Sequence, residues 1–155
     1  QDSTSFLDLR IVDKSGKTLT INQYLLTQTV HEFDWKATYF AHTPTIKHQN
    51  LRQINSLPKV RIEPKFYSKT IKDKTYLTVE LENRTSTLAL SVEIMIKENK
   101  TGDFVAPVYL DDNYFSLLPG EKRTVKGYCY TKDLNGSKPF VNITGINLAE
   151  QAPKF

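Results

Sequence analysis

The sequence is poor in the residues that mark several large classes of protein. It has a single cysteine, Cys129, which excludes an intrachain disulfide and a cysteine-based metal cluster. Its six glycines form no phosphate-binding loop motif. No apolar run approaches the ~18 residues that a membrane-spanning helix requires, so we expect no membrane span. At 155 residues the chain is also too short for a TIM barrel.

Charge and histidine content exclude two further classes. The 21 lysines and arginines against 17 acidic residues give a net charge of +4, but the lysines are scattered singly, so we expect no nucleic-acid partner. His31, His42 and His48 have no cysteine or carboxylate at metal-ligand spacing. We therefore expect no metal site and no cofactor.

What the sequence has in quantity is β-branched residues. Nine valines, ten isoleucines and 17 threonines stand against six alanines, a composition that favours strands. Apolar Leu77, Val79 and Leu81 alternate with polar residues, which predicts a half-buried strand over residues 75–82. The same alternation over residues 88–97 predicts a second strand. Cys129 alternates toward the same core as Val125 and is expected to be buried.

Further strands follow between turn signals. Pro107 indicates an edge strand, Pro119-Gly120 a type II turn, and Gly145 a β-bulge within the last strand. About seven short strands without an amphipathic helix, over residues 58–149, predict an all-β, immunoglobulin-like antiparallel β-sandwich. The additional strands are expected at 60–62, 104–105, 108–110, 114–118, 123–130 and 140–148.

The first 57 residues follow a different pattern. Alternation over residues 7–11 and 18–22 around a polar turn predicts a β-hairpin, which alone is marginally stable. Residues 27–56 have no sustained period, and a helical turn is expected only at 49–54. We therefore expect residues 1–57 to be the C-terminal remnant of a truncated neighbouring sandwich domain plus a linker, and 150–155 to be a tail. The start at Gln1 rather than Met predicts further sequence upstream.

One segment carries a specific family resemblance. Residues 112–121 read D-N-Y-F-S-L-L-P-G-E, which resembles the S-D-N-Y-F-x-L-L-P-G-E segment in the last domain of glycoside hydrolase family 2 enzymes of the β-mannosidase and exo-β-glucosaminidase type. Its motif residues are Asp112, Asn113, Tyr114, Phe115, Pro119, Gly120 and Glu121.

Other landmarks match the family in the same order. Residues 13–17 with 22–24 are similar to its D-x-x-G-K and N-x-Y, and residues 33–35 and 57–60 are similar to its D-W and L-P-x-V. The resemblance thus covers about residues 7–148. The chain departs from the family pattern at Leu25 and at residues 110–111, which leaves both enzyme types open.

The resemblance implies a role without catalysis. The chain is expected to be a noncatalytic C-terminal accessory region that packs against the catalytic barrel and the other domains of a retaining, exo-acting glycosidase. The catalytic glutamates of this family lie on that barrel, so we expect no catalytic residue here and no enzyme activity of the chain alone. The resemblance also implies export to the periplasm, cell surface or medium.

The motif residues are expected to be structural. Asp112 and Asn113 are predicted to bond neighbouring backbone amides in a turn, with Tyr114 and Phe115 anchoring it in the core. The alternative is that Asp111, Asp112 and Asn113 supply oxygens to Ca²⁺, although the spaced glycine and bidentate glutamate of known calcium loops are missing.

Two other function classes remain open. Trp35, Tyr39 and Phe40 are sugar-contact candidates, because pyranose faces pack on aromatic rings, and they would make the chain a stand-alone carbohydrate-binding module. The alternative is that these rings cover a domain junction. The third hypothesis is a cell-surface adhesion domain that offers an apolar patch or a free sheet edge to a protein partner.

Overall fold

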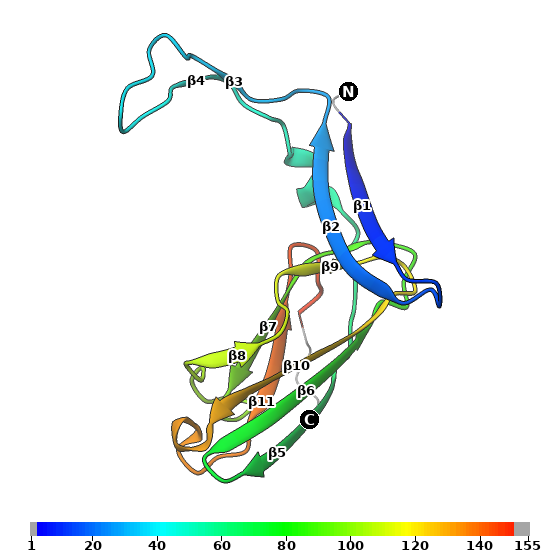
Figure 1. The fold of residues 1–155 in the computed structure, drawn as a ribbon, viewed down its shortest axis with the longest axis vertical. Helices are drawn as coiled ribbons and strands as arrows, with labels where there is room; N and C mark the ends of the chain where they lie inside the picture. The colour runs from blue at the N-terminus through cyan, green and yellow to red at the C-terminus, as the bar shows by residue number, and fades with distance from the viewer. Residues whose placement is uncertain (1–2, 151–155) are drawn as a thin grey trace. The chain divides into compact units, whose positions relative to one another are not determined.

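The computed structural model of the protein describes residues 3–150 (Figure 1). The chain forms two compact units, Gln1–Ser56 and Leu57–Phe155. Residues 151–155 of the predicted tail lie outside the described residues. Between residues 3 and 150, no helix combines the length and the apolar character needed to cross a membrane.

In the first unit, β1 (Thr4–Val12) and β2 (Thr18–Thr27) form the predicted antiparallel hairpin. Asp13 organises its turn: the carboxylate accepts hydrogen bonds from the backbone amides of Ser15 at 2.8 Å and Lys17 at 3.0 Å. The hydroxyl of Ser15 also donates to this carboxylate, and this hydrogen bond is the main reason that the pKa of Asp13 is lowered.

The rest of the first unit is largely irregular, in agreement with its lack of periodicity. Two short strands, β3 (Glu32–Phe33) and β4 (Thr45–Lys47), pair with each other and close a loop over residues 34–44. A 3-10 helix, η1 (Arg52–Ser56), overlaps the predicted helical turn over residues 49–54. It begins where the side-chain oxygen of Asn50 accepts a hydrogen bond from the amide of Arg52 at 3.1 Å.

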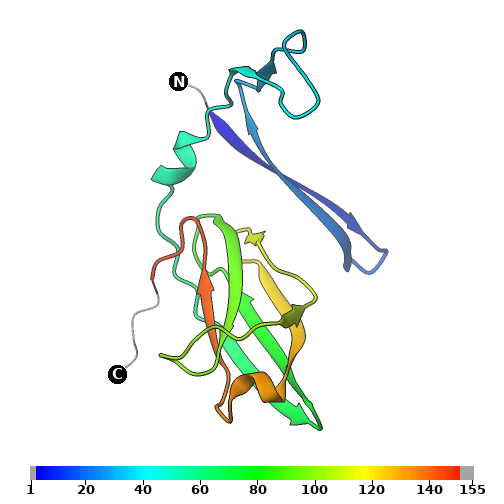
Figure 2. The same cartoon turned by 90° about the vertical axis from the view of Figure 1, so that its left-hand side faces the viewer.

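The second unit is the predicted immunoglobulin-like sandwich, and the described residues supply seven strands to it (Figure 2). One sheet has the order β5-β6-β10-β8 and the other β11-β7-β9. A second 3-10 helix, η2 (Thr131–Leu134), follows β10. The strands are β5 (Lys65–Ile71), β6 (Lys74–Glu82), β7 (Ala89–Lys97), β8 (Val108–Leu110), β9 (Phe115–Leu117), β10 (Lys122–Tyr130) and β11 (Phe140–Thr144).

The hydrophobic core lies between these two sheets. Leu77, Val79 and Leu81 of β6 are buried, as the alternation of the sequence predicts, and the apolar residues of β7 face them. Cys129 of β10 is also buried, which confirms its predicted position. Burial of these side chains is the main stabilising contribution to the unit, because apolar burial contributes about 25 cal/mol per Å².

The predicted first strand at residues 60–62 is wrong. Val60 forms only an isolated parallel bridge with Leu148, in which its amide donates to the carbonyl of Asn147 at 2.8 Å. The strand that pairs with β6 on the side away from β10 is β5, which no alternation in the sequence indicates. Val60 and Ile62 are nevertheless fully buried, which explains why their apolar spacing resembled a strand.

The predicted bulge at Gly145 is also wrong, because β11 ends at Thr144 and the chain turns over the start of β7. The amide of Ile146 donates to the carbonyl of Leu90 at 3.0 Å. A Cβ atom on Gly145 would lie 3.1 Å from that carbonyl oxygen and 2.8 Å from the side chain of Leu148. The glycine thus allows a close approach of two backbones.

The prediction of an edge strand at Pro107 is confirmed. β8 follows this proline directly and is the last strand of the four-stranded sheet, where it pairs only with β10 among the described strands. Proline has no amide hydrogen to donate to a ladder, so an edge is where the sheet tolerates it.

Candidate functional site

The motif segment over residues 112–121 crosses from β8 to β10 and includes β9. Asn113 anchors the start of this segment to β7: its Oδ1 atom accepts a hydrogen bond from the amide of Ile94 at 2.7 Å, and its Nδ2 atom donates to the carbonyl of Ile94 at 3.1 Å. Oδ1 also accepts from the amide of Tyr114 at 3.0 Å. The predicted local turn therefore describes only this last bond, because the other two reach across to β7.

Phe115 and Tyr114 lie in different environments. Phe115 is buried in the core, as predicted, but Tyr114 is exposed, so the prediction of a core anchor was wrong for Tyr114. Its backbone has a φ of 57°, and its hydroxyl donates to the carboxylate of Glu93 at 2.8 Å. This hydrogen bond to a carboxylate raises the pKa of Tyr114.

The predicted type II turn closes the segment. The amide of Glu121 donates to the carbonyl of Leu118 at 3.0 Å, and Gly120 has a φ of 76°, which this turn requires. The carboxylate of Glu121 accepts from the amide of Leu118 at 2.9 Å. Pro119 and Gly120 thus lie in a turn that Glu121 stabilises with both its backbone amide and its carboxylate.

Arg123 connects the two ends of the segment. Its guanidinium bonds the carboxylate of Asp112 at 2.9 Å and that of Glu121 at 3.0 Å. The same group lies 4.4 Å from the ring centroid of Phe115, a cation–π distance. Both acidic motif residues therefore serve as partners of one arginine, which fits a structural role.

Other carboxylates of this unit are engaged as well. Asp111 accepts a hydrogen bond from the amide of Lys126 at 2.8 Å, whereas Asp112 bonds the guanidinium of Arg123, so the two neighbouring carboxylates have different partners. Glu82 pairs with Arg84, and the hydrogen bond from this arginine lowers the pKa of Glu82. Within residues 3–150, no group of three or more histidine, cysteine or acidic side chains is placed to hold a metal ion.

The sugar-contact candidates lie in the loop between β3 and β4. Asp34 shapes the start of this loop, because its carboxylate accepts from the amides of residues 36 and 37 at 3.0 Å each. The exposed fractions of Trp35, Tyr39 and Phe40 are 72%, 65% and 107%. The ring of Trp35 contacts that of Phe33 at 5.4 Å, and among the described residues no ring contact joins Trp35 to the other two candidates.

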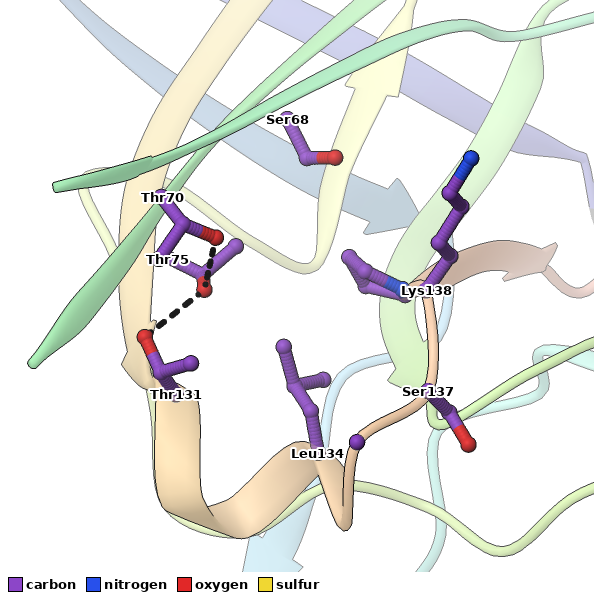
Figure 3. Close-up of a pocket in the computed structure, with 9 residues that line it drawn as sticks. Ser68, Thr70, Thr75, Thr131, Leu134, Ser137 and Lys138 are labelled. Carbon is purple, nitrogen blue, oxygen red and sulfur yellow. Dashed lines mark hydrogen bonds between the residues drawn. The ribbon is translucent and has the colours of Figure 1, made fainter.

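A pocket of about 490 Å³, lined by both polar and apolar side chains, opens between β5, the start of β6 and η2 (Figure 3). The hydroxyl of Thr75 bonds those of Thr70 and Thr131, each at 3.0 Å. Leu134 and Lys138 also line this space. No sequence pattern indicates the pocket, because its walls come from residues 68–75 and 131–139, which only the sandwich topology brings together.

Residues 40–148 match the family model described as the exo-beta-D-glucosaminidase Ig-fold domain. The chain belongs to this family. This match confirms the resemblance to glycoside hydrolase family 2 enzymes of the exo-β-glucosaminidase type. The chain is 33% identical over 153 residues to an exo-beta-D-glucosaminidase of Streptomyces avermitilis and 32% identical over 153 residues to that of Amycolatopsis orientalis, covering 96% of this chain in both cases.

Solved structures support the same family assignment. A crystal structure of an exo-chitosanase from Amycolatopsis orientalis superposes with a TM-score of 0.89 at 30% identity over 96% of this chain. The glucosaminidase Ig-fold chain covers only 17% of the Streptomyces relative, 15% of the Amycolatopsis relative and 18% of the exo-chitosanase structure. Each of these relatives is therefore several times longer than this chain.

Proposed function

We propose that this chain is the noncatalytic C-terminal accessory region of a retaining exo-β-D-glucosaminidase. Its role is to pack against the other domains of that longer protein, here called the parent enzyme, and to stabilise the catalytic barrel. One observation carries this proposal: the chain matches exo-beta-D-glucosaminidases through its Ig-fold domain, yet it covers less than a fifth of their length. The names of these relatives support the exo-β-glucosaminidase branch over the β-mannosidase branch.

The hairpin of the first unit supports a packing role. One face of β1–β2 carries five apolar side chains, and all of them are exposed within the described part of the chain. A two-stranded sheet with a bare apolar face is marginally stable in water, so this face requires a cover. We propose that residues 1–57 complete a neighbouring sandwich domain of the parent enzyme. The five residues are Leu7, Leu9, Ile11, Tyr24 and Leu26.

The chemistry belongs to the barrel of the parent enzyme. A retaining glycosidase uses two carboxyl groups about 5–5.5 Å apart, one as nucleophile and one as acid and base. In this chain the acidic motif residues Asp112 and Glu121 are both hydrogen-bonded to Arg123. We therefore assign the chain no catalytic residue, and the family resemblance further leads us to propose that the parent enzyme is exported.

The first test is the size of the native polypeptide, by immunoblot of source cells with an antibody raised to this chain. We expect a band several times larger than 17.8 kDa. The full-length protein is then assayed for release of glucosamine from chitosan oligosaccharides, before and after brief heating, with and without this region. Deletion should shorten the half-life of activity on heating. A native band at 17.8 kDa would overturn the proposal.

A second candidate, a carbohydrate-binding module, is favoured by the exposure of Trp35, Tyr39 and Phe40. Exposed rings on a loop shaped by hydrogen bonds can stack on sugar faces. Calorimetric titration of the chain with chito-oligosaccharide tests it, with Trp35→Ala as the variant and Phe104→Ala as a control at an exposed aromatic of the second unit. No heat of binding at millimolar sugar would remove this candidate.

A further inference from the structure

The outer face of the four-stranded sheet carries a cluster of tyrosines. Tyr76 of β6, Tyr128 of β10 and Tyr109 of β8 are direct cross-strand neighbours, and Tyr130 follows on β10. These four residues are here called the tyrosine patch. The strands lie side by side in one sheet (Figure 1), and the next residues along them, Thr75 and Cys129, point into the core.

The rings of the tyrosine patch contact one another, and all four residues remain partly exposed. The rings of Tyr109 and Tyr128 stack with centroids 4.9 Å apart and planes at 20°. The ammonium group of Lys74 lies 4.0 Å from the ring centroid of Tyr128. Tyr76 and Tyr109 each remain 46% exposed. A half-exposed aromatic cluster held in one geometry is typical of the centre of a protein interface, where tyrosine is enriched.

The surroundings of the tyrosine patch are basic. Lys69 pairs with Tyr76, Lys74 pairs with Tyr130, and Lys126 lies on the adjacent cross-strand row. The residues in register on these three rows include no carboxylate, but Asp111 lies next to Lys126 and its carboxylate accepts a hydrogen bond from the amide of Lys126. Three lysines against this one carboxylate leave the surroundings basic. An occupant with acidic groups around an apolar centre would therefore be attracted, whereas a second copy of this face would place lysine against lysine.

We propose that the tyrosine patch is a docking surface for an acidic face on another domain of the parent enzyme. This inference rests on the proposed function, because it requires a longer polypeptide. The arrangement of the rings disfavours a sugar ligand, since Tyr109 and Lys74 flank the ring of Tyr128. The ammonium groups of a glucosamine polymer would also be repelled by the lysines.

Photo-crosslinking of the full-length protein tests this proposal. p-Benzoylphenylalanine replaces Tyr109 in one variant and Phe104, an exposed aromatic outside this sheet, in the control. We expect the p-benzoylphenylalanine that replaces Tyr109 to crosslink, within the same polypeptide, to a peptide outside this chain that is rich in Asp and Glu. The same residue in place of Phe104 should give several-fold less of this product. Lys74→Glu in the Tyr109 variant should reduce the yield several-fold, whereas Lys59→Glu should not.

The outcomes separate this inference from the proposed function. A native polypeptide of 17.8 kDa overturns both. A long polypeptide in which Tyr109 crosslinks no better than Phe104, or crosslinks to a second copy, overturns the docking surface alone. Retention of the chain on immobilised chitosan that is lost on Tyr109→Ala would replace the protein partner with a polysaccharide.

Discussion

Asn113 and Ile94 are joined by two hydrogen bonds that mimic a strand pair, with the side-chain amide of Asn113 in place of a backbone. The side chain extends the edge of β7 beyond the residues that β9 pairs with. The start of the motif segment is thereby tied to β7 by a side chain, whereas β9 farther along the segment is tied to β7 by a ladder. The position of this start depends on one amide that both donates and accepts.

We expect Asn113→Ala to lower the free energy of unfolding by about 2 kcal/mol, because it removes both bonds and leaves the backbone groups of Ile94 without them. Urea denaturation of the chain measures this. Asn99→Ala is the matched control, since the side-chain bonds of Asn99 are local and exposed, and it should change stability by no more than about 0.5 kcal/mol. Equal effects of the two substitutions would contradict this account of the motif.

Gly127 lets β8 approach β10. A Cβ atom at this position would lie 2.1 Å from the carbonyl oxygen of Tyr109, a distance that no side chain can occupy. We therefore expect Gly127→Ala to displace β8 and to destabilise the second unit by about 3 kcal/mol, as measured by urea denaturation. Lys126→Ala, on the exposed face next to it, should be close to neutral. A stable Gly127→Ala variant would show that β8 adjusts at little cost.

The complete core of the chain begins after residue 57. Removal of residues 1–55 leaves every buried apolar residue of the core in place, of which Val60 is the first. We expect this shorter chain to keep most of the thermal stability of the whole chain. Removal of residues 1–63 also takes away Val60 and Ile62, and it should lower the melting temperature by more than 10 °C, since two buried side chains contribute about 3–6 kcal/mol. Similar losses in the two truncations would contradict the prediction.

Burial raises the pKa of the Cys129 thiol, with a smaller contribution from Asp133. In the unfolded chain this thiol ionises at its ordinary pKa of 9.0, below the pKa in the folded state. The contribution of Cys129 to stability is therefore fully present below pH 9 and decreases as the pH rises above that value. We expect iodoacetamide to react slowly with the folded chain at pH 8 and rapidly in urea. Fast reaction without denaturant would show that β10 opens.

Strict alternation explains which strands the sequence could predict. β7 places an apolar residue at every inward position, and β6 does so from Leu77 onward, after the inward Thr75, so their period is unmistakable. β5 has only Phe66 as an apolar inward residue, followed by Ser68 and Thr70, which line the pocket. A strand that borders a pocket lacks the apolar alternation by which a strand is predicted. Val60 and Ile62 have this alternation but do not form a strand.

The functional features divide in the same way. The motif identified Asn113, Phe115 and the turn at Gly120 as structural, since these depend on local residue type. Their partners could not be predicted, because Ile94 is 19 residues from Asn113 along the chain. The tyrosine patch likewise depends on the register of β6, β10 and β8, which no periodicity specifies.

The parallel bridge between Val60 and Leu148 gives the second unit a mechanical property. The amide of Val60 bonds the carbonyl of Asn147, and the amide of Ala149 bonds the carbonyl of Val60, both at 2.8 Å. Tension applied at residues 57 and 150 pulls these two parallel segments in opposite directions along their length. The bonds are then loaded in shear and must break together rather than one after another. The unit should therefore resist this tension more strongly than it would if the two segments could be peeled apart bond by bond.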